Sequence, residues 1–278
     1  MLCFPNAKIN IGLNIVQKRS DGYHNIETVF CPVDLSDILE LVPLPGLPAG
    51  NYSFSQTGLP LEGTVHDNLC VKAYRLLLRD FNLPAVDIHL HKMIPVGAGL
   101  GGGSSDAAFM LKHLNRQFDL NLSEERLIDY ASALGSDCAF FIRNKPLFGY
   151  DRGNRFRDIP VFPDNLEVTL VFPGIHISTA DAYSGVRPKK PLRPLEELII
   201  RPVEQWRGNI NNDFETTLFA SFPVLGIIKD RLYQHGAVYA SMSGSGSSVY
   251  GLFRQSPPDI QEVFQDYFCW TGPLSAAI

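Results

Sequence analysis

The sequence predicts an α+β protein, and three observations carry that prediction. Apolar residues alternate with polar ones in some segments, which indicates strands, and recur at helical spacing in others. The strands and helices do not alternate regularly, so a doubly wound parallel sheet is disfavoured. The chain has 278 residues, of which 45% are hydrophobic and 19% charged, as is typical of globular proteins. This length allows one large domain or two modest ones.

The first fifty residues predict strands and then a loop. In residues 4–16, apolar residues alternate with Lys8 and Asn10, so these two side chains project from one face of a strand. Residues 24–41 hold apolar runs broken by a proline and an aspartate and are also predicted as strands. Residues 43–50 are rich in proline and glycine and are predicted as a loop.

The next segment predicts helices and one further strand. Residues 68–81 place apolar side chains on one helical face, and residues 86–93 alternate as a half-buried strand does. A helix follows the glycine-rich segment described below, because apolar residues recur there at helical spacing. A last helix begins after Ser123 as the N-cap and ends near Gly135 as the C′ residue.

The pattern changes after about residue 155, where we place a domain boundary. Beyond it, the sequence predicts strands over 168–172, 237–242 and 249–253, and a short helix with an asparagine cap over 211–222. The predicted domains are residues 1–155 and residues 156–278.

Composition excludes several classes of protein. The net charge of −5 and the pI near 5.8 argue against a nucleic-acid or membrane-surface protein, but not against a phosphorylated ligand. The N-terminus does not resemble a signal peptide, and no apolar run is long enough to span a membrane. The five cysteines are widely spaced and predict neither disulfides nor a zinc site. We expect a cytoplasmic monomer or homodimer without nucleic-acid or membrane partners.

A glycine-rich segment is the strongest functional signal. Five of the seven residues from Gly97 to Gly103 are glycine, and a predicted helix follows directly. Glycine lets the backbone approach a ligand closely, and a helix N-terminus presents unpaired N–H groups, so the segment predicts a phosphate site. Ser104 and Ser105 could cap the helix or contact a phosphate or its metal. A tight turn is the alternative, but it needs only one or two glycines.

Two other phosphate motifs fit this segment less well. A Walker A loop is excluded, because its Gly-Lys-Ser/Thr end is missing. Gly97, Gly99 and Gly102 do form G-x-G-x-x-G, and Asp119 follows at the distance of roughly 20 residues that a dinucleotide fingerprint requires. The residues around Asp119, however, predict a turn into a helix and not the end of a strand.

The segment PVGAGLGGGSSDAA, residues 95–108, resembles the phosphate loop of the GHMP kinases. Two further motifs of that superfamily occur in the expected order, over residues 6–10 and 241–247. The resemblance spans almost the whole chain. It implies a ribosomal-protein-S5-like N-terminal domain and a ferredoxin-like C-terminal domain with the active site between them. It also implies ATP as phosphate donor, with Mg²⁺, whose protein ligands the sequence does not identify.

Local features narrow the resemblance to one branch. Residues 19–24, with the sequence RSDGYH, and Gly135-Ser136-Asp137 resemble the kinases that phosphorylate 4-diphosphocytidyl-2-C-methyl-D-erythritol. This implies ATP-dependent phosphorylation of the 2-hydroxyl of the methylerythritol moiety, in non-mevalonate isoprenoid biosynthesis. Asn6 stands where the branch usually has proline. Two alternatives are a related kinase acting on a mevalonate- or homoserine-like alcohol, and a non-catalytic GHMP-like binding protein.

The resemblance also implies roles for individual residues. Without it, Lys8 and Asn10 could be solvated, Asp137 could be a capping or surface aspartate, and Tyr23 and His24 could be an ordinary hairpin pair. On the resemblance, the expected catalytic residues are Lys8 and Asp137; the expected ATP-binding residues are Asn68, Lys92, Pro95, Val96, Gly97, Ala98, Gly99, Leu100, Gly101, Gly102, Gly103, Ser104 and Ser105; and the expected substrate-binding residues are Asn10, Tyr23, His24, Tyr183 and Gly244. Of these, Tyr23, His24 and Tyr183 are expected at the cytosine of the substrate.

His89 and His91 are the remaining candidates for a metal site. They are two residues apart on a predicted strand, a spacing that can fit a metal, but no third ligand is evident. An exposed strand face is the favoured interpretation, and the sequence assigns no residue as a metal ligand.

Overall fold

The computed structural model describes residues 1–61, 63–163 and 165–274, and its chain forms two compact units. The first unit holds Met1–Ala7, Leu35–Val96 and Gly101–Asn144. The second holds the remaining described residues, including the short segment Gly97–Leu100. The predicted α+β class is confirmed. The predicted boundary at residue 155 stays a prediction, because these units interleave along the chain and do not test it.

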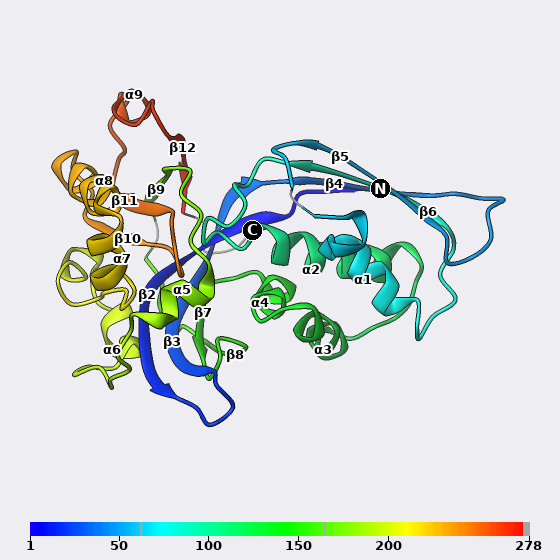
Figure 1. Ribbon diagram of the computed structural model, residues 1–278, viewed down its shortest axis with the longest axis horizontal. Helices are drawn as coiled ribbons and strands as arrows, with labels where there is room; N and C mark the ends of the chain where they lie inside the picture. Colours follow the sequence, from blue (N-terminus) through cyan, green and yellow to red (C-terminus); the bar gives the residue numbers. More distant parts are fainter. Residues whose placement is uncertain (62, 164, 275–278) are drawn as a thin grey trace. The chain divides into compact units, whose positions relative to one another are not determined.

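The first unit packs helices on one face of a sheet (Figure 1). Among the described residues the strand order is β1-β4-β6-β5, and only β5 and β6 run parallel. Side chains of β6 are buried alternately, as predicted for this segment. The sequence did not reveal β5, because most of its residues are polar. The strands are β1 (Leu2–Cys3), β4 (Ile38–Pro43), β5 (Tyr52–Gly58) and β6 (Val86–Lys92).

Capping residues set where the helices of this unit begin. The Asn68 side chain accepts a hydrogen bond from Cys70 N at 2.8 Å, and Ser123 accepts one from Arg126 N at 3.4 Å, so the predicted cap at Ser123 is confirmed. The helix that begins after Ser123 ends before Gly135, as predicted, but Gly135 is its C-cap with an extended φ of 174° and not the C′ residue. The elements are η1 (Val65–Asp67), α1 (Leu69–Leu77), α2 (Gly102–Gln117), α3 (Glu124–Leu134) and α4 (Cys138–Arg143).

A second sheet is formed by long N-terminal strands and two shorter ones. Its order is β2-β3-β7-β8, and most of it belongs to the second unit. The strands predicted over residues 24–41 are confirmed as β3 and β4, and β3 runs through Pro32 without a break. The strands are β2 (Asn6–Lys18), β3 (His24–Ser36), β7 (Leu147–Tyr150) and β8 (Arg155–Asp158).

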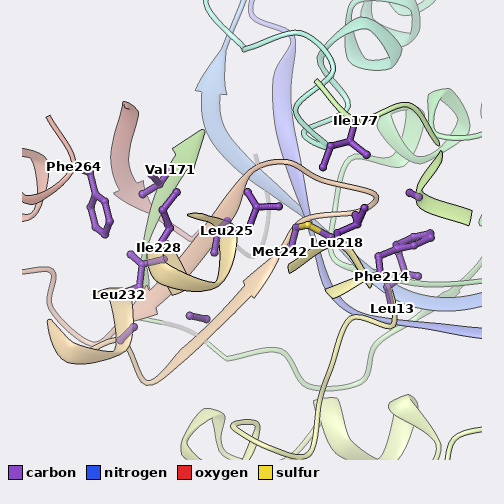
Figure 2. Packing of buried hydrophobic residues seen from close by; sticks show 14 of the residues in the cluster. Leu13, Val171, Ile177, Phe214, Leu218, Leu225, Ile228, Leu232, Met242 and Phe264 are labelled. Carbon is purple, nitrogen blue, oxygen red and sulfur yellow. The ribbon is translucent and has the colours of Figure 1, made fainter. Parts of the chain in front are cut away.

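The second unit also contains an antiparallel sheet of order β10-β11-β9-β12, with α7 and α8 on one face (Figure 1). Figure 2 shows Leu225, Ile228 and Leu232 of α8, which lie on one helical face, packed in this core beside Val171. The predicted helix over 211–222 begins only at Glu215. The elements are β9 (Glu167–Phe172), β10 (Tyr239–Met242), β11 (Val249–Phe253), β12 (Phe268–Pro273), α7 (Glu215–Ser221) and α8 (Pro223–Gln234).

Asn212 explains the late start of α7. Its Nδ2 donates to the carbonyl oxygens of Met242 and Gly244, and its Oδ1 accepts from Phe214 N, so it ties the chain to the 243–248 turn and is not the cap of a helix. The remaining helices are α5 (Thr179–Ser184), α6 (Leu195–Ile199), η2 (Val203–Gln205) and α9 (Ile260–Val263). In the described part of the chain, no helix has the length and apolar character needed to cross a membrane.

Candidate active site

In the second unit, Lys8 lies beside Gly97–Leu100, the part of the glycine-rich segment (the glycine loop) that belongs to this unit. Its side chain is only 3% exposed, so the solvated interpretation is wrong. The Nζ atom donates to Asn10 Oδ1 at 2.5 Å and to the carbonyl oxygen of Gly99 at 3.0 Å, and it lies 5.5 Å from the centre of the Phe30 ring. Lys8 and Asn10 therefore do share one strand face, and a buried positive charge is fixed next to the loop.

The turn over residues 243–248 anchors the loop segment Gly97–Leu100. Ser243 Oγ donates to the carbonyl oxygen of Gly99 at 2.9 Å, and Ser248 N donates to that of Ala98 at 3.0 Å. Gly99 has a φ of +77°, and a Cβ there would lie 2.1 Å from the Ser243 carbonyl oxygen, so only glycine fits.

Gly244 brings a third predicted residue to this cluster. A Cβ on Gly244 would lie 3.2 Å from Asn10 Oδ1 and 3.5 Å from Lys8 Nζ. His176, which the sequence gave no reason to single out, lies against the loop, since a Cβ on Gly97 would be 2.5 Å from its Nδ1. The loop backbone is therefore closely surrounded in the second unit.

Two of the three expected cytosine-binding residues stack on each other. The rings of His24 and Tyr183 are 4.7 Å apart between centroids and 18° from parallel, and Tyr183 also meets Phe214 edge-on. Burial, helped by the charge of Lys18, lowers the pKa of His24. Tyr23 is 57% exposed, and the Arg152 guanidinium lies 4.9 Å from its ring centre. Flat aromatic faces suited to a base are thus present.

In the first unit, helix α2 begins at the end of the loop. Its N-cap is Gly101, with a φ of 71°, so neither Ser104 nor Ser105 caps the helix. Ser105 is fully buried in the first turn, and its Oγ has no hydrogen-bond partner among the described residues. An unpartnered buried hydroxyl beside a helix N-terminus is suited to an anionic ligand.

Lys92 lies in a buried ionic cluster that the sequence did not reveal. Its Nζ pairs with one oxygen of Asp37 and with Asp106 Oδ2, the latter at 2.8 Å, and all three side chains are buried. Asp37 Oδ1 also accepts from Met93 N and Ile94 N, at 2.6 and 2.9 Å. The cluster ties β6 to the segment before β4 and to α2.

The cluster also shifts the protonation equilibria of its members. Burial raises the pKa of Asp106 to about 7, although the Lys92 ammonium opposes this. Burial alone would lower the pKa of Lys92, but the carboxylates of Asp106 and Asp37 outweigh it and raise the pKa. The ammonium group of Lys92 is therefore stabilised by its two carboxylate partners.

The structure places the other two expected residues of this unit at helix starts. Asn68 is the N-cap of α1, as its hydrogen bond from Cys70 shows. Asp137 directly precedes α4 and is partly buried, but its side chain makes no capping hydrogen bond there. Asp137 is therefore the N-cap residue of α4 by position, but its side chain does not cap the helix.

His89 and His91 lie on a half-buried strand face and contact hydroxyl groups. Their ring nitrogens lie 2.8 to 3.1 Å from the hydroxyls of Ser55 and Thr57 on β5. Among residues 1–61, 63–163 and 165–274, no group of three or more His, Cys, Asp or Glu side chains is arranged to hold a metal ion.

Two family models match this chain. The model of the GHMP kinases N terminal domain matches residues 68–145, and that of the GHMP kinases C terminal domain matches residues 195–268. The 4-diphosphocytidyl-2-C-methyl-D-erythritol kinase of Bacteroides thetaiotaomicron is 54% identical over 275 residues, which cover 99% of this chain and 100% of that protein.

Solved structures show the same relationship. A crystal structure of 4-(cytidine 5'-diphospho)-2C-methyl-D-erythritol kinase superposes with a TM-score of 0.82 at 31% identity, over 98% of each chain. The mevalonate kinase of Methanococcus jannaschii, at 16% identity over 99% of this chain and 98% of that one, shares the fold with a TM-score of 0.74. The chain belongs to the GHMP kinase family, in the branch of the 4-diphosphocytidyl-2-C-methyl-D-erythritol kinases.

Proposed function

We propose that this chain transfers the γ-phosphate of ATP to the 2-hydroxyl of 4-diphosphocytidyl-2-C-methyl-D-erythritol, a step of non-mevalonate isoprenoid biosynthesis. Membership of the GHMP kinases makes it a small-molecule kinase that uses ATP. The observation that carries the proposal is the buried ammonium of Lys8, fixed by Asn10 and by the Gly99 carbonyl of the glycine loop. Phosphoryl transfer requires such a positioned positive charge.

ATP is assigned to the loop Pro95–Ser105, including Val96, Leu100 and Gly103, and to Asn68 and Lys92. Gly97 and Gly103 are exposed, and α2 presents its first N–H groups at the end of the loop. Lys92 is buried on two carboxylates, so we assign it to holding β6 and α2 in place around the nucleotide.

Mg²⁺ would accompany ATP and neutralise charge on its phosphates. Ser105 fits this ion or a phosphate, because its buried Oγ is an oxygen donor without another partner among the described residues. Phosphate oxygens and water can complete the coordination shell of magnesium, so few protein ligands are needed.

Asp137 is assigned as the base that accepts the proton of the 2-hydroxyl. As the hydroxyl oxygen forms its bond to phosphorus, the bond from the γ-phosphorus to the β,γ-bridging oxygen breaks and ADP leaves. Lys8 stabilises the negative charge that develops on the attacking oxygen. Full deprotonation before attack is unnecessary, because the carboxylate takes the proton as the new bond forms.

The cytidine end is assigned to Tyr23, His24 and Tyr183. Aromatic rings stack on a base, and an imidazole can hydrogen-bond its edge. Asn10 and Gly244 are assigned to the alcohol end, because both lie beside the Lys8 ammonium. In this arrangement one end of the substrate is recognised as a nucleotide and the other is phosphorylated.

An ADP-release assay tests the proposal against its alternatives. The chain is given ATP with the cytidine-diphosphate substrate, with mevalonate or with homoserine, under identical conditions. We expect substrate-dependent ADP release with the cytidine compound alone. Release with another alcohol would contradict the assigned substrate, and no release with any of them would favour a binding protein.

A further inference from the structure

We propose that Thr28 is a positioning residue for phosphoryl transfer: its hydroxyl fixes the side-chain amide of Asn10 and, through that amide, the ammonium group of Lys8. The inference rests on the proposed function, since it assumes that Lys8 acts in the reaction. Thr28 lies in β3 and is completely buried.

Chemistry fixes the direction of each hydrogen bond in this group. A lysine ammonium can only donate, so Asn10 must turn its Oδ1 toward Lys8, at 2.5 Å. The Nδ2 of Asn10 then donates to Thr28 Oγ1, at 3.1 Å. The Thr28 hydroxyl in turn donates a hydrogen bond to the carbonyl oxygen of Gly12, at 2.5 Å. The three hydrogen bonds are therefore donated in one direction, from the Lys8 ammonium through Asn10 and Thr28 to the Gly12 carbonyl.

The far end of this chain of hydrogen bonds is set by the backbone. Gly12 has a φ of +66°, and a Cβ there would lie 2.7 Å from Ile210 Cγ2, so no other residue fits without rearrangement. The orientation of its carbonyl group is thus a property of the strand. A fixed acceptor determines where the Thr28 hydroxyl points, and so which lone pair Thr28 offers to Asn10.

The two known acceptors of Lys8 differ in rigidity. The Gly99 carbonyl belongs to the main chain and also accepts from Ser243 Oγ. The Asn10 amide belongs to a side chain and can rotate unless its Nδ2 is held. Without the Thr28 hydroxyl, that buried Nδ2 loses its partner, which costs free energy and loosens the amide. Lys8 would then lose a positioned acceptor, although the two hydrogen bonds of the Thr28 hydroxyl join it to Asn10 and Gly12 and not to Lys8 itself.

Three variants separate positioning from general packing. Thr28→Val keeps the shape but removes the hydroxyl, Thr28→Ser keeps the hydroxyl, and Thr169→Val is the matched control. Thr169 is also fully buried in a strand of the second unit, and its Oγ1 lies 3.1 Å from Thr271 Oγ1. The measurements are kcat, the KM for ATP, and the melting temperature of each variant.

We expect Thr28→Val to lower kcat roughly 10- to 100-fold, the cost of one lost buried polar contact, with little change in the KM for ATP. Thr28→Ser should recover most of the activity, and Thr169→Val should keep kcat near the wild-type value despite a lower melting temperature. The proposal is overturned if serine is as damaging as valine at position 28, or if both valine variants lower kcat equally.

A double variant tests whether Thr28 acts through Asn10. If it does, Thr28→Val added to Asn10→Ala should lower kcat no further than Asn10→Ala alone. If the two substitutions instead lower kcat independently, so that their effects multiply in the double variant, Thr28 does not act through Asn10 and the proposal is overturned. These kcat measurements use whichever alcohol the wild-type chain phosphorylates. An unexpected substrate would therefore contradict the proposed function but would not affect the test of Thr28.

Nuclear magnetic resonance of the ligand-free protein gives a readout without turnover. The side-chain amide protons of Asn10 should be protected from solvent exchange in the wild type and in Thr28→Ser, and exchange faster in Thr28→Val. Equal protection in all three proteins would overturn the link between Thr28 and Asn10 even if kcat had fallen.

Discussion

The imidazole ring of His24 lies face to face on the phenol ring of Tyr183, with 4.7 Å between their centroids. The two residues are far apart in the chain, on β3 and α5, and both were expected at the cytosine of the substrate. Their stacking shows that the second unit by itself assembles an aromatic surface.

Replacing Tyr183 by alanine should weaken binding of cytidine diphosphate by roughly 2- to 13-fold, since an aromatic stack contributes roughly 0.5–1.5 kcal/mol beyond the area it buries. Tyr183→Phe should be mild, because stacking needs the ring and not the hydroxyl. Calorimetric titration with cytidine diphosphate measures the effect, and titration with ADP is the control. A phenylalanine variant as weak as the alanine variant would contradict the stacking role.

His24 should titrate below its usual pKa of about 6.5, because burial disfavours the charged imidazolium and Lys18 adds to the effect. The lowered pKa means that the unfolded chain binds the proton more readily, so this residue's contribution to stability is present above about pH 6.5 and is lost as the pH falls through the folded-state pKa. Proton resonances of the ring measure it directly. Tyr183→Ala exposes the ring and should raise the pKa toward 6.5; an unchanged value would contradict burial as the cause.

Gly99→Ala should reduce ATP binding strongly, because its Cβ would meet the Ser243 carbonyl oxygen at 2.1 Å. Gly174→Ala is a matched control, since Gly174 has nearly the same φ, +75° against +77°, and an added Cβ would meet no atom within 4 Å. Both variants carry the backbone strain of about 1–2 kcal/mol, but only Gly99→Ala should displace the loop. ATP affinity by fluorescence titration distinguishes them, and equal affinities would exclude the loop from the nucleotide site.

Asp37→Asn should destabilise the protein more than Asp106→Asn. An asparagine at position 106 can turn its oxygen toward Lys92 and put its nitrogen where Asp106 Oδ1 has no partner among the described residues. At position 37, one oxygen must accept from Met93 N and Ile94 N, so the new amide nitrogen would face the Lys92 ammonium. Breaking a buried ion pair costs about 3–5 kcal/mol. Chemical denaturation measures the difference, and the reverse order would refute this account of the cluster.

Asp137→Asn should lower kcat by about 10²- to 10⁴-fold, the usual contribution of a positioned base, while ATP affinity stays nearly unchanged. Lys8→Ala should be comparably damaging, and the double variant should be little worse than either single one if both residues serve the same step. Rapid-quench kinetics isolate the chemical step. Near-normal turnover of Asp137→Asn would remove the base from the mechanism.

Local patterns in the sequence were enough to predict much of the fold. Alternation identified β6 and the shared face of Lys8 and Asn10, and cap chemistry placed the start of α3 at Ser123. Strand β5 was missed, because its polar residues carry little hydrophobic signal. The start of α7 was misplaced, because the Asn212 side chain bonds to carbonyl groups thirty residues away and not to its own helix.

The missed parts of the candidate site have a common cause. Lys92 was expected at the nucleotide, but its partners Asp37 and Asp106 were missed, because each alone is a charged residue that would ordinarily face solvent. Only the folded chain shows that the three residues neutralise one another. Thr28 is similar, since nothing local reveals that its hydroxyl lies between Asn10 and Gly12. Long-range polar partners leave no periodic trace in a sequence.

The identity of the product tests the central claim most directly. The chain is incubated with ATP, Mg²⁺ and 4-diphosphocytidyl-2-C-methyl-D-erythritol, and the product is examined by mass spectrometry and phosphorus NMR. The account predicts a mass increase of one phosphoryl group, a new phosphomonoester resonance at the 2-oxygen, and an equal amount of ADP. ADP formed without a phosphorylated product, or a phosphate at another position of the substrate, would contradict it.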